Sequence, residues 1–226
     1  MTYSEIRQAA RDNLQGNYWL SVLVSFVAVV LGAIITGGTI FRVDVDAEVL
    51  HRLPRFIVRY LAIMGSISGF FALVQFIIGG TVQLGYAKSL LKQHNHASFD
   101  IHDLFSQFDR FKEGFLQKFL RTLYIFLWSL LLIIPGIVKS YSYAMTPFIM
   151  AENPQMSAKE AIEASKQLMH GHKDELFTLD LTFFGWGLLA ALTLNIGYIF
   201  LNPYKNAAYA AFYRQIQAEA RYTTYE

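Results

Sequence analysis

The chain has 226 residues with a formal net charge of +2, and 54% of its residues are hydrophobic whereas only 16% are charged. An average soluble domain carries roughly 25% charged residues, so one soluble core of this size could not enclose so many apolar side chains. The small net charge argues against a nucleic-acid partner. The lack of cysteine excludes disulfides, thiolate metal sites and a cysteine nucleophile. The composition therefore indicates a single integral membrane domain over residues 1–226.

The amino-terminal residues predict a short amphipathic helix at the membrane interface. Thr2 and Glu5 have the spacing of a capping box, and Gly16 follows as a helix stop. Apolar residues at helical spacing would share one face between these signals: Ile6, Ala9, Ala10 and Leu14. The apolar run 19–40 is longer than the hydrophobic part of a cleaved signal peptide, so we expect it to remain as the first transmembrane helix.

A polar segment, 41–59, and a second apolar span, 60–87, come next. Gly65 and Gly69 form a G-x-x-x-G pair in this span, and small residues at that spacing let two helices approach closely. We expect the pair to pack against another helix of the chain, with a homodimer contact as the alternative. The Gly79-Gly80 pair near the end of the span is expected to interrupt the helix.

Residues 88–118 are polar, but apolar residues at helical spacing predict a second interfacial helix within them: Ile101, Leu104, Phe105, Phe108 and Phe111. The third span, 115–134, meets Pro135-Gly136, where the helix should kink or end because proline removes a backbone hydrogen bond and clashes with the preceding turn. Residues 137–150 form either a short return span or a re-entrant piece.

The carboxyl-terminal part repeats this pattern. Ser157 and Glu160 form another capping box, which begins a third amphipathic helix that Gly171 closes. Residues 176–195 form the next span, since a helix rising about 1.5 Å per residue crosses the roughly 30 Å hydrocarbon core in about 20 residues. Breaks at Asn195-Ile196-Gly197 and at Asn202-Pro203 would separate it from a return helix that begins near residue 204.

These elements predict an all-α, polytopic membrane protein with about six transmembrane helices in three hairpins, each preceded by a short amphipathic interfacial helix. Gly16, Gly114 and Gly171 would each end such a helix, an internal similarity that reflects either a structural repeat or a common membrane pattern. Lysine and arginine are more frequent in the segments that six spans place inside, so both termini are expected to be cytoplasmic. Five spans, with 137–150 not crossing, would move the carboxyl terminus outside.

Several short motifs along the chain form a recognisable set. They are Leu14-x-Gly16-Asn17-x-Trp19, residues 132–137, residues 151–154, residues 165–171, Gly185-Trp186, Asn202-Pro203-Tyr204 and residues 207–214. Together they resemble the domain-of-unknown-function 975 family of bacterial integral membrane proteins, over nearly the whole chain. The resemblance implies a multi-pass plasma-membrane protein, mostly from Gram-positive bacteria, and supplies no activity, substrate or catalytic residue. The chain also resembles the membrane portion of some glycerophosphodiester phosphodiesterases, without their catalytic domain.

Charged residues inside the predicted spans are the main candidates for a functional site, because an ionisable group in lipid is costly. Asp180 lies about 7 Å inside its span, and Arg121 enters the third span to a similar depth. We expect them to form a structural ion pair between hairpins; the alternatives are snorkelling of both side chains to the interface and an ion or proton path. Lys139 and Lys205, at the outer ends of two return helices, are expected to contact anionic lipid or to bind another anion.

Metal binding and catalysis receive little support from the residue patterns. The side chains that could ligate a metal lie in polar connectors and at a helix stop, so we expect no metal there: His94, His96, His102, Asp103, His170 and His172. The chain lacks H-E-x-x-H, G-x-S-x-G and P-loop motifs and a G-x-G-x-x-G between a strand and a helix. We therefore nominate no catalytic residue and no cofactor.

The sequence favours a non-enzymatic multi-pass membrane protein that acts through helix and lipid contacts, as an accessory, assembly or immunity-type factor. Its expected partners are membrane lipids and either another membrane protein or a second copy of the chain, with no nucleic acid. The alternative is a small transporter or exporter component whose broken helices line a pathway. A polar cavity between the hairpins would favour the alternative.

Overall fold

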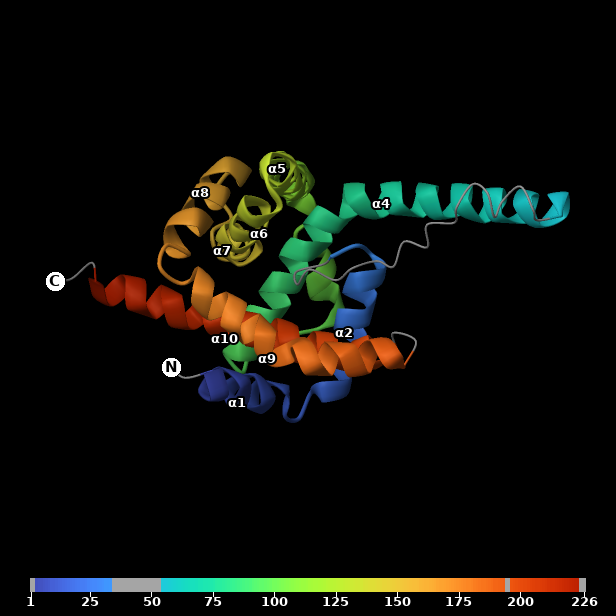
Figure 1. Ribbon diagram of the computed structural model, residues 1–226. Coiled ribbons are helices and arrows are strands. Elements are labelled where there is room, and N and C mark those ends of the chain that lie inside the picture. Colours follow the sequence, from blue (N-terminus) through green and yellow to red (C-terminus); the bar gives the residue numbers. More distant parts are fainter. Residues whose placement is uncertain (1–2, 34–53, 194–195, 224–226) are drawn as a thin grey trace.

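A computed structural model describes residues 3–33, 54–193 and 196–223, and every regular element within these ranges is helical, as predicted (Figure 1). In chain order the elements are α1 (Tyr3–Leu14), α2 (Tyr18–Val30), α4 (Arg55–His94), the 3-10 helices η1 (Ile101–Phe105) and η2 (Phe108–Arg110), α5 (Phe111–Leu131), α6 (Ile133–Ser142), α7 (Thr146–Glu152), α8 (Ala158–Leu168), α9 (Lys173–Leu192) and α10 (Gly197–Thr223).

Two helical stretches are long and apolar enough to cross a membrane. They are Gly69–His94, which is the greater part of α4, and Lys173–Leu192, which is α9. The pair α1 and α2, bent by 100° at the break between them, would add a third if the two counted as one span. By length and composition, the described residues thus account for two or three of the six predicted spans.

The buried core lies where α7, α10 and the second half of α4 meet. Residues 146–151 of α7 are all buried, and the Phe148 ring stacks on the Tyr213 ring of α10 with centroids 5.5 Å apart. Four alanines of α10 are buried beside that tyrosine and bring neighbouring helices close: Ala207, Ala208, Ala210 and Ala211. Figure 1 shows α9 alongside α10, while the first half of α4 extends away from the other helices.

The glycine pair at 79 and 80 does not interrupt α4, contrary to the prediction. A Cβ added at Gly80 would lie 2.8 Å from the carbonyl carbon of Gly114 in α5, and a Cβ at Gly79 would lie 2.9 Å from the carbonyl carbon of Gly32, just after α2. These glycines therefore mark a close crossing of three segments. Gly114 likewise lies inside α5 and does not end a helix.

Other local signals are confirmed. Gly16 and Gly171 follow short helices with φ of 86° and 88°, the left-handed conformation that glycine adopts without steric cost. Ser157 and Glu160 form the predicted capping box of α8. The Ser157 backbone amide donates to the Glu160 carboxylate at 2.8 Å, and this bond, with one from the Ser157 hydroxyl, holds the pKa of Glu160 below its usual value.

The short amphipathic helices differ from the interfacial helices predicted for them. The apolar face of α1 packs against α10, with Ile6, Ala10 and Leu14 buried, so protein covers it. The second predicted helix is absent, and η1 and η2 occupy its place. The reason is local: Asp100 and Asp103 form a capping box that starts a tight turn, and Leu104 is then buried beside Gly85 of α4.

The break predicted at Asn202-Pro203 is also wrong, because α10 continues through Pro203. Proline removes one backbone donor, but Pro203 is buried and lines a small cavity with residues of α2 and α4. The break predicted at Pro135-Gly136 is confirmed in position: α5 ends at Leu131 and α6 starts at Ile133, so Pro135 falls in a first turn that needs no donor there.

Candidate functional site

A carboxylate on α9 joins three helices. The Asp180 Oδ2 atom accepts hydrogen bonds from the Tyr209 hydroxyl of α10 at 2.8 Å and from the Tyr141 hydroxyl of α6 at 3.1 Å. The Lys205 Nζ atom, also on α10, lies 3.0 Å from Asp180 Oδ1. The Asp180 and Lys205 side chains are 21% and 20% exposed, so the pair is largely withdrawn from solvent. Charge-assisted bonds of this kind are roughly twice as strong as neutral ones, and here they hold α6, α9 and α10 together.

The predicted ion pair between Arg121 and Asp180 is not formed. Arg121 donates instead to the Gln83 side-chain oxygen of α4 at 3.3 Å, and Gln117 donates to the same oxygen at 3.2 Å. Similar depth in two helices did not determine which way each side chain faces. Lys205 is the partner of Asp180, and its lipid contact stays a prediction. The i,i+4 spacing of Lys205 and Tyr209 was the available signal, because it places both on one face of α10.

A second ionic network, which the sequence did not predict, joins α7 to α10. The Arg214 Nη1 atom lies 2.5 Å from Glu152 Oε1. The Tyr213 hydroxyl and the Gln217 side-chain amide donate to Glu152 Oε2 at 2.7 and 2.9 Å. The signal was the presence of Glu152 and Arg214 in two of the motifs that carry the family resemblance. Nothing in the sequence indicated that these residues meet.

Lys118 of α5 holds the three-segment crossing described above. Its Nζ atom donates to the Gly32 carbonyl at 2.9 Å and to the Gln75 carbonyl of α4 at 3.1 Å. Gly32 follows the end of α2, where helix carbonyls lack partners and carry partial negative charge, so a cation there is favourable. This contact gives Lys118 a structural role that neither composition nor spacing suggested.

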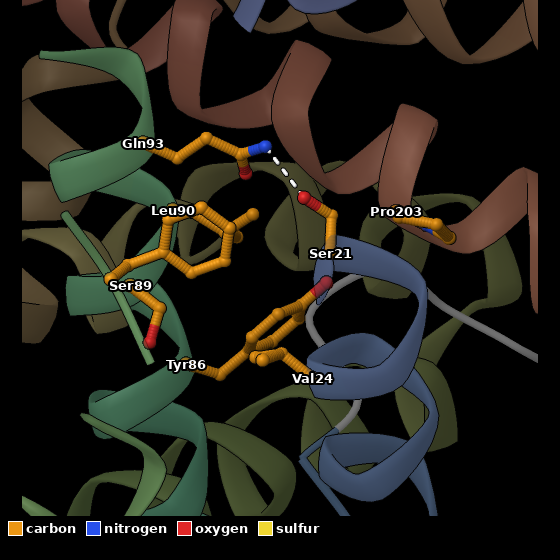
Figure 2. Close-up of a pocket in the computed structure, with 8 residues that line it drawn as sticks. Ser21, Val24, Tyr86, Ser89, Leu90, Gln93 and Pro203 are labelled. Atoms are coloured by element: carbon orange, nitrogen blue, oxygen red, sulfur yellow. Dashed lines mark hydrogen bonds between the residues drawn. The ribbon is translucent and has the colours of Figure 1, made fainter. Parts of the chain in front are cut away.

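A small cavity lies between α2, α4 and α10 (Figure 2). It measures about 10 Å³ and is lined by Ser21, Val24, Tyr86, Ser89, Leu90, Gln93, Phe99 and Pro203. The Gln93 side-chain amide donates to the Ser21 hydroxyl at 2.7 Å across its mouth, as the dashed line in Figure 2 shows. A cavity of this size holds about one water molecule. It is too small for a substrate pathway.

The remaining candidate residues stay apart or bind elsewhere. Within the described ranges no three histidine, aspartate or glutamate side chains gather as a metal site would require. His94 contacts the Asn13 amide at 2.9 Å, and Asp103 pairs with Lys92 at 2.6 Å. Lys139 lies over the Trp128 ring, 4.7 Å from its centroid, and its lipid contact stays a prediction.

Gly65 and Gly69 were predicted to pack against another helix, and at Gly69 the described residues show no such partner. A Cβ on Gly69 would have no atom within 4 Å among the described residues. Gly65 lies in α4, in a stretch where side-chain surroundings are not described. Packing within the chain is therefore not seen at Gly69, and a contact with a second copy stays a prediction.

Comparison with known families agrees with the motifs. Residues 130–220 match the family described as "Protein of unknown function (DUF975)". Residues 130–220 belong to the DUF975 family. The DUF975 match covers the helices from α6 to α10, and therefore both ionic networks, whereas α1, α2 and α4 lie outside it. No curated protein and no solved structure shows a significant match to this protein.

Proposed function

We propose that this protein is a non-enzymatic, multi-pass membrane protein that acts through helix and lipid contacts. The observation that carries the proposal is the exposure of large apolar side chains along several helices. The most exposed ones lie on α2, α4, α5, α6 and α9 and at the turn between α5 and α6: Trp19, Phe70, Phe71, Phe126, Leu130, Leu131, Leu132, Ile133, Ile134, Phe184 and Leu192. Contiguous apolar surface on this scale belongs in lipid or against another membrane protein.

The three-hairpin arrangement is part of this proposal. α2 with α4, α5 with α6, and α9 with α10 enter the bilayer as pairs, and both termini stay in the cytoplasm of a cell membrane. The helix contacts support this arrangement, because the two helices of each pair pack against each other in the described residues. The excess of lysine and arginine in the inner segments supports the orientation.

An accessory or assembly role fits the way that the charged side chains are used. Asp180, Glu152 and Lys118 are each engaged by donors or acceptors of other helices, which is the pattern of structural pairs. Phe70, Phe71 and Leu73 of α4 are exposed and offer an apolar surface to another membrane protein or to a second copy. The cavity between α2, α4 and α10 holds only about one water molecule, so it does not supply a pathway for the transport alternative.

Membrane fractionation tests the proposal directly. We expect the protein to remain in the membrane pellet after alkaline carbonate washing and to be released by detergent. A reporter fused after Glu226 should be active only if the carboxyl terminus is cytoplasmic. Recovery of a folded monomer in the soluble fraction without detergent would contradict the proposal. An enzymatic turnover that survives purification to a single chain would contradict its non-enzymatic part.

A further inference from the structure

We infer that the α5–α6 hairpin enters only one leaflet of the bilayer and leaves it on the side from which it entered. Its tip, residues 130–138, is then held among the acyl chains of that leaflet. The inference rests on the proposed membrane function and names the partner of one surface, namely the hydrocarbon of a single leaflet.

The tip is apolar and uncovered by the rest of the described chain. Five consecutive residues, 130–134, are each between 66% and 75% exposed, and Ile137 and Val138 continue the surface at 50% and 43%. Gly136 packs tightly against Ser129, since a Cβ there would lie 2.9 Å from the serine Cα, so the two arms close on each other. The apolar side chains consequently point outward around a closed tip.

α6 and the apolar part of α5 are too short to cross the membrane. α6 has 10 residues, so it is about 15 Å long, half of the roughly 30 Å hydrocarbon core. Apart from Phe111 at its first residue, the exposed apolar side chains of α5 begin at Phe119 and reach Leu131, about 18 Å of helix. The earlier part of α5 carries Lys112, Glu113, Lys118 and Arg121, and α5 is not among the stretches apolar enough to cross.

The chain returns to the starting level of α5 inside the protein. After α6, α7 is buried in the core, so no lipid-facing segment continues into the second leaflet. Arg110, just before α5, donates to the carbonyls of Met150 and Met156 at 3.2 and 3.0 Å. Glu113 accepts a hydrogen bond from the Ala158 amide at 2.9 Å. The entrance and the exit of the hairpin are therefore bound together on one side.

The charges around the hairpin match the headgroup region of the same leaflet. Lys112 is exposed at the start of α5, and Lys139 lies beside the Trp128 ring on the return arm. Cations at the ends of apolar segments are typical of the membrane interface, and the long side chain of Lys139 can extend from the end of the tip toward the headgroups. A hairpin that crosses twice and a hairpin that does not cross both return the chain to its starting side. The helices after α6 therefore keep the orientation that six spans would give them. Five crossings with an outside carboxyl terminus do not arise.

The absence of cysteine allows a clean test. Single-cysteine variants are made at the tip, Ile134→Cys and Leu132→Cys, with Lys112→Cys as the matched control on α5. Each is reconstituted in sealed vesicles and treated with a membrane-impermeant maleimide from either side. Tip cysteines are then labelled with an environment-sensitive dye in vesicles of lipids brominated at shallow or deep chain positions. Variants are used only if their elution profile in detergent matches that of the parent.

We expect Lys112→Cys to be labelled from one side, both tip variants to lose labelling from either side, and the deep bromines to quench the tip dye most. Labelling of the tip from the side opposite Lys112→Cys would show a full crossing and overturn the inference. Labelling from the same side, or protection without bromine quenching, would also overturn it, because the tip would lie in water or against protein. In all these cases membrane retention would leave the proposed function intact. Recovery in the soluble fraction would instead remove the proposed function itself.

Discussion

The crossing of α4 and α5 gives a quantitative test of the fold. Alanine in place of glycine in a helix interior stabilises the helix by about 1 kcal/mol. At Gly80 the added Cβ would lie 2.8 Å from the carbonyl carbon of Gly114, against about 3.5–4.0 Å for unstrained carbon contacts. The obstacle is backbone, so the two helices must separate by about 1 Å. Such overpacking costs about 1–3 kcal/mol. The separation would also lengthen the hydrogen bonds from Lys118 to the Gly32 and Gln75 carbonyls. We therefore expect Gly80→Ala to destabilise the protein in spite of the gain in helix propensity.

Gly69→Ala is the matched control, because it lies in the same helix and its Cβ would meet no atom within 4 Å. It should be neutral or stabilising by up to about 1 kcal/mol. Unfolding of both variants is measured by SDS titration in mixed micelles, followed by tryptophan fluorescence on the monomer peak. The free energies of unfolding should differ by about 1–3 kcal/mol between the two variants. Equal stability of the two would refute the close crossing of α4 and α5.

Three further predictions concern the polar contacts. Ser157→Ala removes the cap of α8 and should lower the free energy of unfolding by about 1 kcal/mol, measured by the same titration; no change would mean that α8 does not depend on its cap. The pKa of Glu160 is lower in the folded state, so its contribution is present above the unfolded value of about 4.3 and is lost as pH falls through the folded pKa. Melting temperature should therefore fall in acid, less so in Glu160→Gln, and an unchanged acid slope in that variant would contradict the assignment. Asp180→Asn should lower the free energy of unfolding by about 1–3 kcal/mol, less than the loss of a fully buried ion pair. Adding Lys205→Gln to Asp180→Asn should restore part of this loss. Destabilisation by Arg121→Gln, with none by Asp180→Asn, would show that the network is wrongly assigned.

Short-range signals were sufficient wherever a structure depends on neighbours in sequence. The capping box of α8, the glycine stops after α1 and α8, and the break before Pro135 all depend on a few adjacent residues. The apolar length of α9 likewise predicted a stretch able to cross a membrane. These features follow from backbone geometry and from hydrogen bonding within one or two turns.

The same kind of signal failed where distant segments decide the outcome. Gly79-Gly80 and Pro203 were expected to break helices, but the first supports a close crossing and the second is buried against α2 and α4. Spacing also predicted a helix at 101–111, where a local aspartate turn and the burial of Leu104 produce 3-10 helices. A breaker residue ends a helix only if tertiary contacts do not compensate for it.

The sequence by itself determined that this protein is helical, that it carries long apolar stretches, where α8 begins, and where α1 and α8 end. Only the tertiary structure decided that Asp180 pairs with Lys205, that Glu152 joins α7 to α10, and that α6 ends after 10 residues. Periodicity gives the depth of a side chain along its own helix. The direction in which that side chain points relative to other helices depends on how the helices pack, and that is set by contacts between residues far apart in the chain.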